Sequence, residues 1–210
     1  QIPHSEVIKQ ATRLNVPVIP EIAIREIIGN AVIHRDYSRT DTYTSIEIFS
    51  NRIEINNPGG LYGDLTIDRL IDHPPRARNE VFAESMKLLN FYEERGSGID
   101  KTVSAMELHC LPPVDFRSNK DHFTAVLHLP RPFDSMSREE RINAVYQHAC
   151  LNFVCERKTT NATVRERFQF DESQKTKVFR LLNIAIDAGR IKIADPSAGP
   201  KYFHYLPYWA

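Results

Sequence analysis

Polar side chains recur at every fourth position in the segment 20–34, where Glu26, Asn30 and His34 follow one another. At about 100° per residue, positions four apart lie on one face of a helix, one turn above another. A carboxylate and an amide so placed suit water activation by the Glu and Mg²⁺ binding through the Asn carbonyl oxygen. The spacing alone is more typical of an ordinary polar helix edge, so this chemistry needs further support.

Two glycine-bearing segments supply such support. Asn57-Pro58-Gly59-Gly60 follows a predicted strand, and Gly96-Ser97-Gly98 opens a predicted helix, whose free backbone N–H groups can receive phosphate oxygens. Each segment alone is equally compatible with a simple turn. The sequence contains no P-loop motif, and no strand leads directly into Gly96, which argues against a dinucleotide fingerprint.

Hydrophobic periodicity indicates the elements that position these groups. Residues 20–34 form a predicted helix with Pro20 in its first turn and an apolar stripe of Ile24, Ile27, Ile28 and Ala31. Alternating runs at 44–49 and 52–56 predict a β-hairpin. Further patterns predict helices at 64–71, 79–91 and 99–109 and strands at 112–117 and 122–129. This order favours an α+β sandwich, with helices on one face of a mixed, mostly antiparallel sheet.

A second module follows the linker at 133–137. Helical patterns cover 138–153, 161–168 and 172–188, and Asp171 with Gln174 resembles a capping box at the start of the third. Short runs at 191–193 and 202–205 predict a terminal hairpin. Three helices followed by a hairpin is the order of a winged helix. We therefore expect one α+β domain at 1–133 and a second, winged-helix domain at 137–210.

Charge separates the two modules although the whole chain is neutral. Residues 1–136 hold 15 Lys and Arg against 19 Asp and Glu, whereas residues 137–210 hold 12 against 8. An acidic first part and a basic second part favour two modules with different partners. A basic solvated surface and a nucleic-acid surface both remain open for the second module.

Several protein classes are excluded by composition. No run of about 18 apolar residues is present, so we expect no membrane contact, and the start of the chain lacks the features of a secretion signal. Three cysteines without a Cys-x-x-Cys pair argue against a disulfide framework or a zinc site. We therefore expect a cytoplasmic protein, and the missing initiator Met favours a piece of a longer chain.

Taken in order, the motifs resemble the Bergerat-fold (GHKL) ATPases. Residues 25–31 look like the N box, residues 55–61 like the G1 box and residues 95–99 like the G2 box. The stretch 30–37, the Asn-Pro-Gly-Gly turn and residues 94–99 more narrowly resemble prokaryotic ATP-binding transcriptional regulators. In that family the ATPase-like domain follows an AlbA-type, Schlafen-like domain and precedes a winged helix.

The resemblance implies roles for individual residues. It implies a general base, Glu26, and a Mg²⁺ ligand, Asn30. It implies an ATP-binding set comprising Asn30, Asn57, Gly59, Gly96, Ser97, Gly98 and Thr124. Within that set, Asn57 and Gly59 would approach the adenine, Thr124 would support it, and the later glycines with Ser97 would line the phosphates. Asn57 replaces the usual Asp, which weakens the expected bond to the adenine amino group. The stretch His34-Arg35-Asp36 receives no chemical role.

The third helix of a winged helix normally enters the major groove of DNA. The predicted DNA-binding set lies at the start of that helix and in the hairpin: Ser173, Gln174, Lys175, Lys177, Lys192 and Lys201. Lys suits phosphates and Gln can read adenine. A winged helix used for protein contacts or dimerisation is the alternative.

These features together predict a nucleotide-responsive transcriptional regulator that binds ATP with Mg²⁺ and duplex DNA. One alternative is an active ATPase in DNA metabolism or defence, for which a weak Mg²⁺-dependent activity suffices. The other is a protein-interaction module with a vestigial ATP site. Self-association, the DNA target and the effector are left open.

Overall fold

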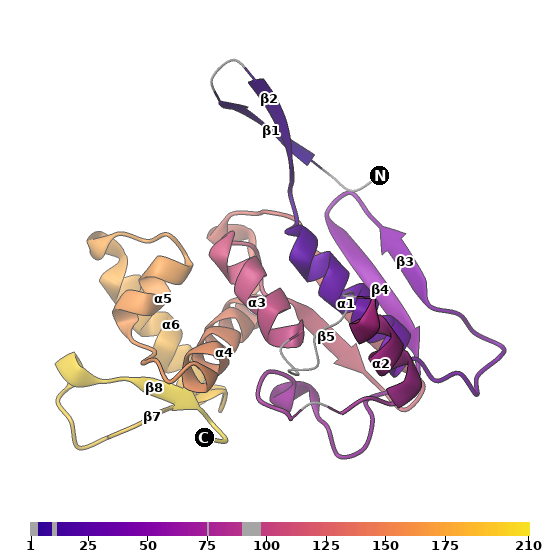
Figure 1. Cartoon of the computed structure of the whole chain (residues 1–210). Coiled ribbons are helices and arrows are strands. Elements are labelled where there is room, and N and C mark those ends of the chain that lie inside the picture. The colour runs from indigo at the N-terminus through magenta and orange to yellow at the C-terminus, as the bar shows by residue number, and fades with distance from the viewer. Residues whose placement is uncertain (1–3, 10–11, 75, 90–97) are drawn as a thin grey trace. The chain divides into compact units, whose positions relative to one another are not determined.

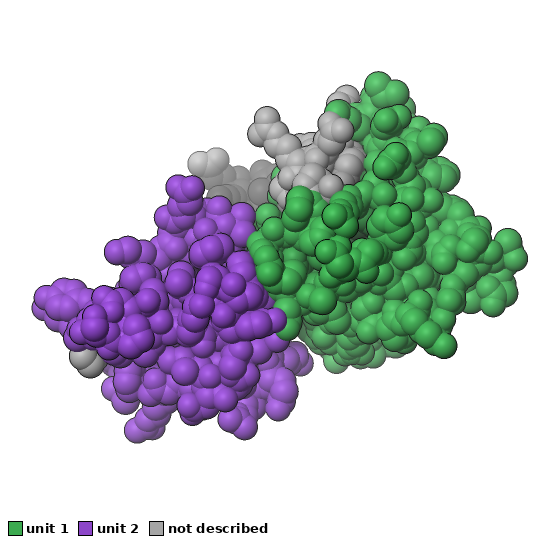
Figure 2. All heavy atoms as spheres, turned by 90° about the horizontal axis from the view of Figure 1, so that it is seen from below, with its two compact units in different colours: residues 1–109, 114–130 green, residues 110–113, 131–210 purple. Residues whose placement is uncertain are grey.

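The computed structural model describes residues 4–9, 12–74, 76–89 and 98–210 (Figure 1). The chain divides into two compact units, coloured separately in Figure 2. Unit 1 holds residues 1–109 and 114–130, and unit 2 holds residues 110–113 and 131–210. The chain thus passes into unit 2 a few residues before the predicted linker, and the short segment 110–113 packs with unit 2 as well.

A four-stranded antiparallel sheet organises unit 1. Its strands are β3 (Ser45–Ile48), β4 (Arg52–Pro58), β5 (Asp115–Ser118) and β6 (His122–His128), in the order β3-β4-β6-β5. The hairpin predicted at 44–56 and the pairing predicted between the last two strands are both confirmed. The sheet and helices together confirm the predicted α+β class.

One face of this sheet carries apolar core residues and, at the end of β4, the predicted site residue Asn57. In β4 the side chains of Ile53, Ile55 and Asn57 are buried, and those between them are half-buried. Their register partners in β6 are Leu127, Ala125 and Phe123, in that order. Because side chains alternate between the two faces of a strand, these three pairs share one face. The row becomes polar only at Asn57, where the strand ends.

Three helices accompany the sheet: α1 (Glu21–His34), α2 (Glu80–Leu88) and α3 (Gly98–Leu108), with the short turn η1 (Ile67–Arg69) between the first two (Figure 1). Helix α1 packs against α3, α2 and β4. It buries Ala23, Ile27 and Ala31, whereas Ile24 and Ile28 of the predicted stripe are half-buried. Because α1 is covered on several sides, its buried surface also takes in Glu26. The predicted helix at 64–71 is reduced to the single turn η1.

The strands β1 (His4–Lys9) and β2 (Thr12–Pro17) form a separate antiparallel pair that the sequence analysis did not predict. Alternation over so short a stretch is interrupted by the adjacent apolar residues Val7 and Ile8. The period-2 signal of a strand is therefore weak there.

Unit 2 contains α4 (Arg138–Val154), α5 (Asn161–Arg167), η3 (Glu172–Gln174), α6 (Lys175–Asp187) and the paired strands β7 (Ile191–Ile193) and β8 (Tyr205–Pro207), with η2 (Phe133–Ser135) before and η4 (Pro200–Tyr202) between. The predicted helices and the capping box of Asp171 with Gln174 are confirmed. The last strand begins later than predicted, because η4 occupies the start of the expected run. No described helix is long and apolar enough to cross a membrane.

The turn after β4 leaves no room for side chains. Gly59 has φ +96°, and its N–H donates to the Asp121 carbonyl at 2.7 Å. A Cβ on Gly60 would lie 2.0 Å from the Asn119 carbonyl oxygen, a backbone atom that cannot rotate away. This turn is therefore built around glycine at both positions.

We predict that Gly60→Ala lowers the free energy of unfolding of unit 1 by about 1–3 kcal/mol, since the added methyl forces the backbone apart. Chemical denaturation of the whole chain measures it. Gly199→Ala is the matched control, because a Cβ there meets nothing within 4 Å. Equal losses in the two variants would contradict the steric argument.

Candidate functional site

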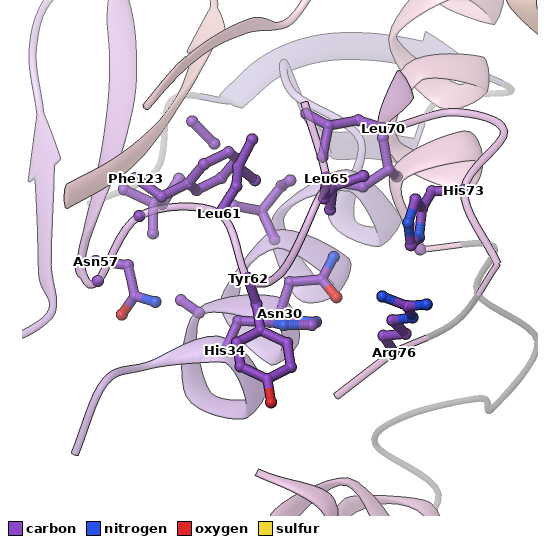
Figure 3. Close-up of a pocket in the computed structure, with 18 of the residues that line it drawn as sticks. Asn30, His34, Asn57, Leu61, Tyr62, Leu65, Leu70, His73, Arg76 and Phe123 are labelled. Atoms are coloured by element: carbon purple, nitrogen blue, oxygen red, sulfur yellow. The ribbon is translucent and has the colours of Figure 1, made fainter. Parts of the chain in front are cut away.

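A cavity in unit 1 gathers most of the described residues that the motifs single out (Figure 3). Its walls come from α1, from the ends of β4 and β6, from the loop after the glycine turn and from the start of α3. Apolar side chains make most of the lining, among them Ile27, Ile55, Leu61, Leu70 and Phe123. The polar lining consists of Asn30, His34, Asn57, Tyr62, His73 and Arg76. An apolar slot with few polar groups is typical of a small-molecule site.

Asn57 provides a fixed polar group at one end of this cavity. It is 3% exposed, and its Oδ1 accepts a hydrogen bond of 2.7 Å from the Thr44 hydroxyl. Figure 3 shows the Asn57 amide nitrogen on the cavity side. Gly59 lines the same cavity next to it. Asn57 and Gly59 therefore lie together, as the resemblance implies.

Asn30, Glu26 and Gly98 meet where α1 faces the start of α3. A Cβ on Gly98 would lie 3.0 Å from Glu26 Oε2 and 3.1 Å from Asn30 Nδ2. The Asn30 Nδ2 is buried and has no hydrogen-bond partner among the described residues. An unpaired buried amide costs free energy unless a ligand or water satisfies it. Gly96 and Ser97, the other two predicted phosphate-lining residues, lie outside the described residues.

Glu26 and Thr124 stand apart from the cavity in different ways. Glu26 is 6% exposed and 3.5 Å from the Arg25 guanidinium, and its carboxylate lies beside the space in front of Gly98 without lining the cavity. Thr124 pairs with Asn56 in the sheet and donates to its Oδ1 at 2.7 Å. Since Asn57 and Phe123 face the cavity, alternation turns Thr124 to the opposite face. The structure therefore does not place Thr124 with the other predicted ATP-binding residues.

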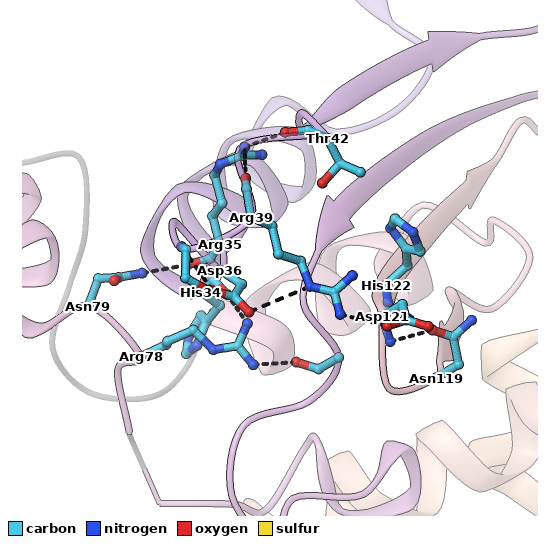
Figure 4. Close-up of polar contacts among 12 residues, drawn as sticks. His34, Arg35, Asp36, Arg39, Thr42, Arg78, Asn79, Asn119, Asp121 and His122 are labelled. Carbon is cyan, nitrogen blue, oxygen red and sulfur yellow. Dashed lines mark hydrogen bonds and ion pairs between the residues drawn. The ribbon is translucent and has the colours of Figure 1, made fainter.

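Side chains that the motifs did not single out hold the end of α1 against the glycine turn (Figure 4). Arg78 donates to the carbonyls of His34 at 3.1 Å and Gly60 at 2.8 Å. Asn79 donates to the carbonyls of Ile33 and Arg35 at 2.8 and 2.7 Å. Arg78 lies in a stretch without periodicity and Asn79 at the first position of the predicted helix 79–91, so only their hydrogen-bonding capacity could have indicated this role.

Charge within the site is controlled by burial. Burial, with the Arg78 guanidinium nearby, lowers the pKa of His34 to about 4, so the imidazole lining the cavity is neutral at pH 7. Burial, with Asp72 nearby, raises the pKa of Asp100 in the first turn of α3 to about 6. Both shifts disfavour the charged form of a group next to the cavity wall.

In unit 2 the predicted DNA-binding residues separate into exposed side chains and side chains held by other groups. Lys175, Lys192 and Lys201 are exposed. Lys177 instead forms an ion pair of 2.8 Å with Asp134 and lies over the Phe133 and Phe170 rings. Ser173 and Gln174 take part in the cap around Asp171.

Helix α6 presents an outward face that the sequence analysis missed. Its core face is Val178, Leu181, Leu182 and Ala185, which are all buried. The exposed residues on the other side recur at helical spacing: Thr176, Phe179, Arg180 and Asn183. The helical spacing of these residues is visible in the sequence, but the predicted DNA-binding set included only residues at the polar start of the helix.

Comparison with known proteins supports an ATPase-like assignment for unit 1. Residues 41–127 match a family described as "Putative ATP-dependent DNA helicase recG C-terminal". The matched range includes Asn57, the glycine turn and Gly98, and begins after α1 with Glu26 and Asn30. No curated protein matches the chain.

A solved structure of similar fold is the DIP2311 protein from Corynebacterium diphtheriae. The TM-score is 0.58 at 21% sequence identity, and the match covers 98% of this chain. It covers 43% of that protein, so this chain spans less than half of its length. At this identity the likeness concerns the fold alone. Residues 41–127 of unit 1 are thus similar to an ATPase-like family, within a chain of α+β fold.

The depressed pKa of His34 predicts acid sensitivity. Between pH 6.5 and about 4, His34 is mostly protonated in the unfolded chain and mostly neutral in the folded chain. The free energy of unfolding therefore falls as pH falls through this window, by about 3 kcal/mol at most. Denaturation curves across the window should show this fall for the unaltered chain and a smaller one for His34→Gln. His122→Gln, at an exposed position, is the control, and an identical response in both variants would contradict the prediction.

Proposed function

We propose that unit 1 binds ATP together with Mg²⁺ and that unit 2 binds duplex DNA, so that the chain acts as a nucleotide-responsive transcriptional regulator. The observation that carries the proposal is the cavity of unit 1, whose lining includes Asn57 as well as Asn30 and Gly98. It lies largely within the range matched to an ATPase-like family.

The two ends of the cavity suit the two ends of a nucleotide. The base lies against apolar walls such as Ile55 and Phe123, with Asn57 at its polar edge. The phosphates lie toward the first turn of α3, where helix N–H groups favour anions. The amide nitrogen of Asn30, which has no partner among the described residues, faces this end, and Arg76 also lines the cavity with its charge paired to Asp64 at 2.9 Å.

The donor set also fits Mg²⁺. Carboxylate and amide oxygens are the hard ligands that this ion prefers, and Asn30 and Glu26 bring both kinds beside Gly98. When bound, the ion neutralises phosphate charge. Asn30 holds that end of the nucleotide, and Glu26 is the base that would take a proton from an attacking water.

An active ATPase is the second candidate function. The position of buried Glu26 beside the space in front of Gly98 favours it, because a carboxylate shielded from bulk water next to the phosphate end suits general-base work. Slow hydrolysis and regulation are compatible. A vestigial site would bind no nucleotide.

The outward face of α6 supports the DNA-binding half of the proposal. Arg180 and Asn183 are side-chain types that read guanine and adenine edges, and Thr176 suits a phosphate. Lys175, Lys192 and Lys201 remain in the proposed phosphate-contacting group. Lys177 contributes less than the sequence predicted, since Asp134 already neutralises it.

For the nucleotide site we predict that the chain binds ATP and that Asn30→Ala weakens the binding about tenfold or more with Mg²⁺ present. Without Mg²⁺ the variant should differ less from the unaltered chain, because a metal ligand matters only when the metal is there. Calorimetry with each protein, with and without Mg²⁺, measures both. Asn183→Ala, on the outer face of α6, is the matched control. Absence of binding at millimolar ATP would sink the proposal.

For DNA we predict that affinity for duplex falls steeply as salt rises, because phosphate contacts release counterions. Lys192→Ala should weaken binding to all sequences alike and reduce the salt slope by about one unit. Arg180→Ala should instead change the preferred sequence. Gel-shift titrations on a random duplex pool at two salt concentrations separate these effects, with Lys120→Ala in unit 1 as control. No affinity at low salt would assign unit 2 to protein contacts.

A further inference from the structure

The stretch His34-Arg35-Asp36 received no chemical role from its residue types, yet Arg35 is connected to the cavity. Its Nη1 donates to the Thr44 hydroxyl at 3.3 Å, and that hydroxyl donates to Asn57 Oδ1 at 2.7 Å. The three side chains form a chain of hydrogen bonds that ends at the base-facing end of the cavity. We call Arg35, Thr44 and Asn57 the amide relay.

The direction of these hydrogen bonds follows from what each group can do. A guanidinium only donates, so Arg35 occupies one lone pair of the Thr44 oxygen. Thr44 then has its single proton to give, and the acceptor within reach is Asn57 Oδ1. If the Asn57 amide were reversed, its N–H could donate to the second lone pair of the Thr44 oxygen, but the Thr44 proton would lose its acceptor. The relay therefore favours one of the two orientations of the amide.

Arg35 is itself held in place, which gives the relay a fixed origin. Its Nη2 donates to the Thr42 carbonyl at 2.6 Å and to the Arg39 carbonyl at 3.4 Å (Figure 4). Asn79 donates to the backbone carbonyl of Arg35. The guanidinium is thus anchored from the loop after α1, and the position of the Thr44 oxygen depends on it.

The orientation of the Asn57 amide decides which base edge it can pair with. Once Oδ1 is held by Thr44, the amide offers the cavity N–H donors and one remaining oxygen lone pair. Adenine presents an acceptor at N1 beside a donor at its 6-amino group, and guanine presents the reverse, a donor at N1 beside an acceptor at O6. A locked amide matches one of these edges, whereas an amide free to turn over can match either.

We propose that Arg35 and Thr44 are positioning residues that lock the Asn57 amide in the orientation required by the adenine of the proposed ATP ligand, so that the cavity selects a 6-aminopurine over a 6-oxopurine nucleotide. This inference rests on the proposed nucleotide binding and deepens it. It also explains how Asn can serve where a carboxylate, which accepts on both oxygens, needs no such lock.

The test compares ATP with GTP binding by calorimetry on the whole chain. The unaltered chain should bind ATP about tenfold or more tightly than GTP, the discrimination that a paired donor and acceptor supply. Thr44→Val keeps the shape and removes the hydroxyl, so the ratio should fall close to one, mainly through tighter GTP binding. Thr44→Ser restores the hydroxyl and should restore the ratio.

Thr42→Val is the matched control, because the Thr42 hydroxyl is buried and has no partner in the described part of the chain, while its backbone carbonyl accepts from Arg35. Its ATP to GTP ratio should stay that of the unaltered chain. Arg35→Met gives a second route to the loss of discrimination if Thr44→Val fails to fold.

The outcomes separate the two levels of the argument. If the unaltered chain binds neither nucleotide, the proposed function falls and the relay with it. If it binds ATP but Thr44→Val keeps the full preference, only the relay is overturned. A preference for GTP in the unaltered chain, or equal binding of both, overturns the inference as well.

Discussion

The site depends on the hydrogen bonds that the carbonyl groups at the end of α1 require. The last turn of a helix leaves carbonyls without intrahelical partners, and buried ones must find donors elsewhere. Here Asn79 serves Ile33 and Arg35, while Arg78 serves His34. Arg78 also donates to the Gly60 carbonyl, so the same side chain caps the helix and holds the glycine turn in position.

This shared donor explains why the turn needs glycine. A Cβ on Gly59 would lie 1.9 Å from Arg78 Nη1, so a side chain there would displace the group that caps α1. The turn is also tied to α1 through the Asp36 N–H, which donates to the Pro58 carbonyl at 2.9 Å. The wall of the cavity formed by the turn and the wall formed by α1 therefore keep a fixed separation. The positive φ of Gly59 is a consequence of that packing and not only of the turn type.

Sequence reasoning succeeded where a signal was local and periodic. The α1 helix, the hairpin of β3 and β4 and the capping box at Asp171 each follow from spacing or residue type within a few positions. It grouped Asn57, Gly59, Asn30 and Gly98 in one site because the motifs occur in the order that the resemblance requires, and all four line one cavity. It did not place Thr124 correctly relative to that cavity, since the face of a strand depends on register, and β6 turns Thr124 toward Asn56. Arg78 and Asn79 were missed because their partners are backbone atoms 18 to 46 residues away, which no local pattern records.

The same packing sets the electrostatic character of the site. Arg78 donates from Nη1 and Nη2 to carbonyls at the cavity wall. Burial of His34, together with the charge of Arg78, keeps the imidazole neutral. Arg35 is likewise committed to the Thr42 carbonyl and the Thr44 hydroxyl. Arg78 and Arg35 thus act on the protein's own polar groups. The amide of Asn57, which is neutral, faces the cavity at this end, so any recognition by Asn57 depends on the direction of hydrogen bonds. At the opposite end Arg76 lines the wall with its guanidinium paired to Asp64, so attraction of an anion there depends mainly on the helix N-terminus where α3 begins.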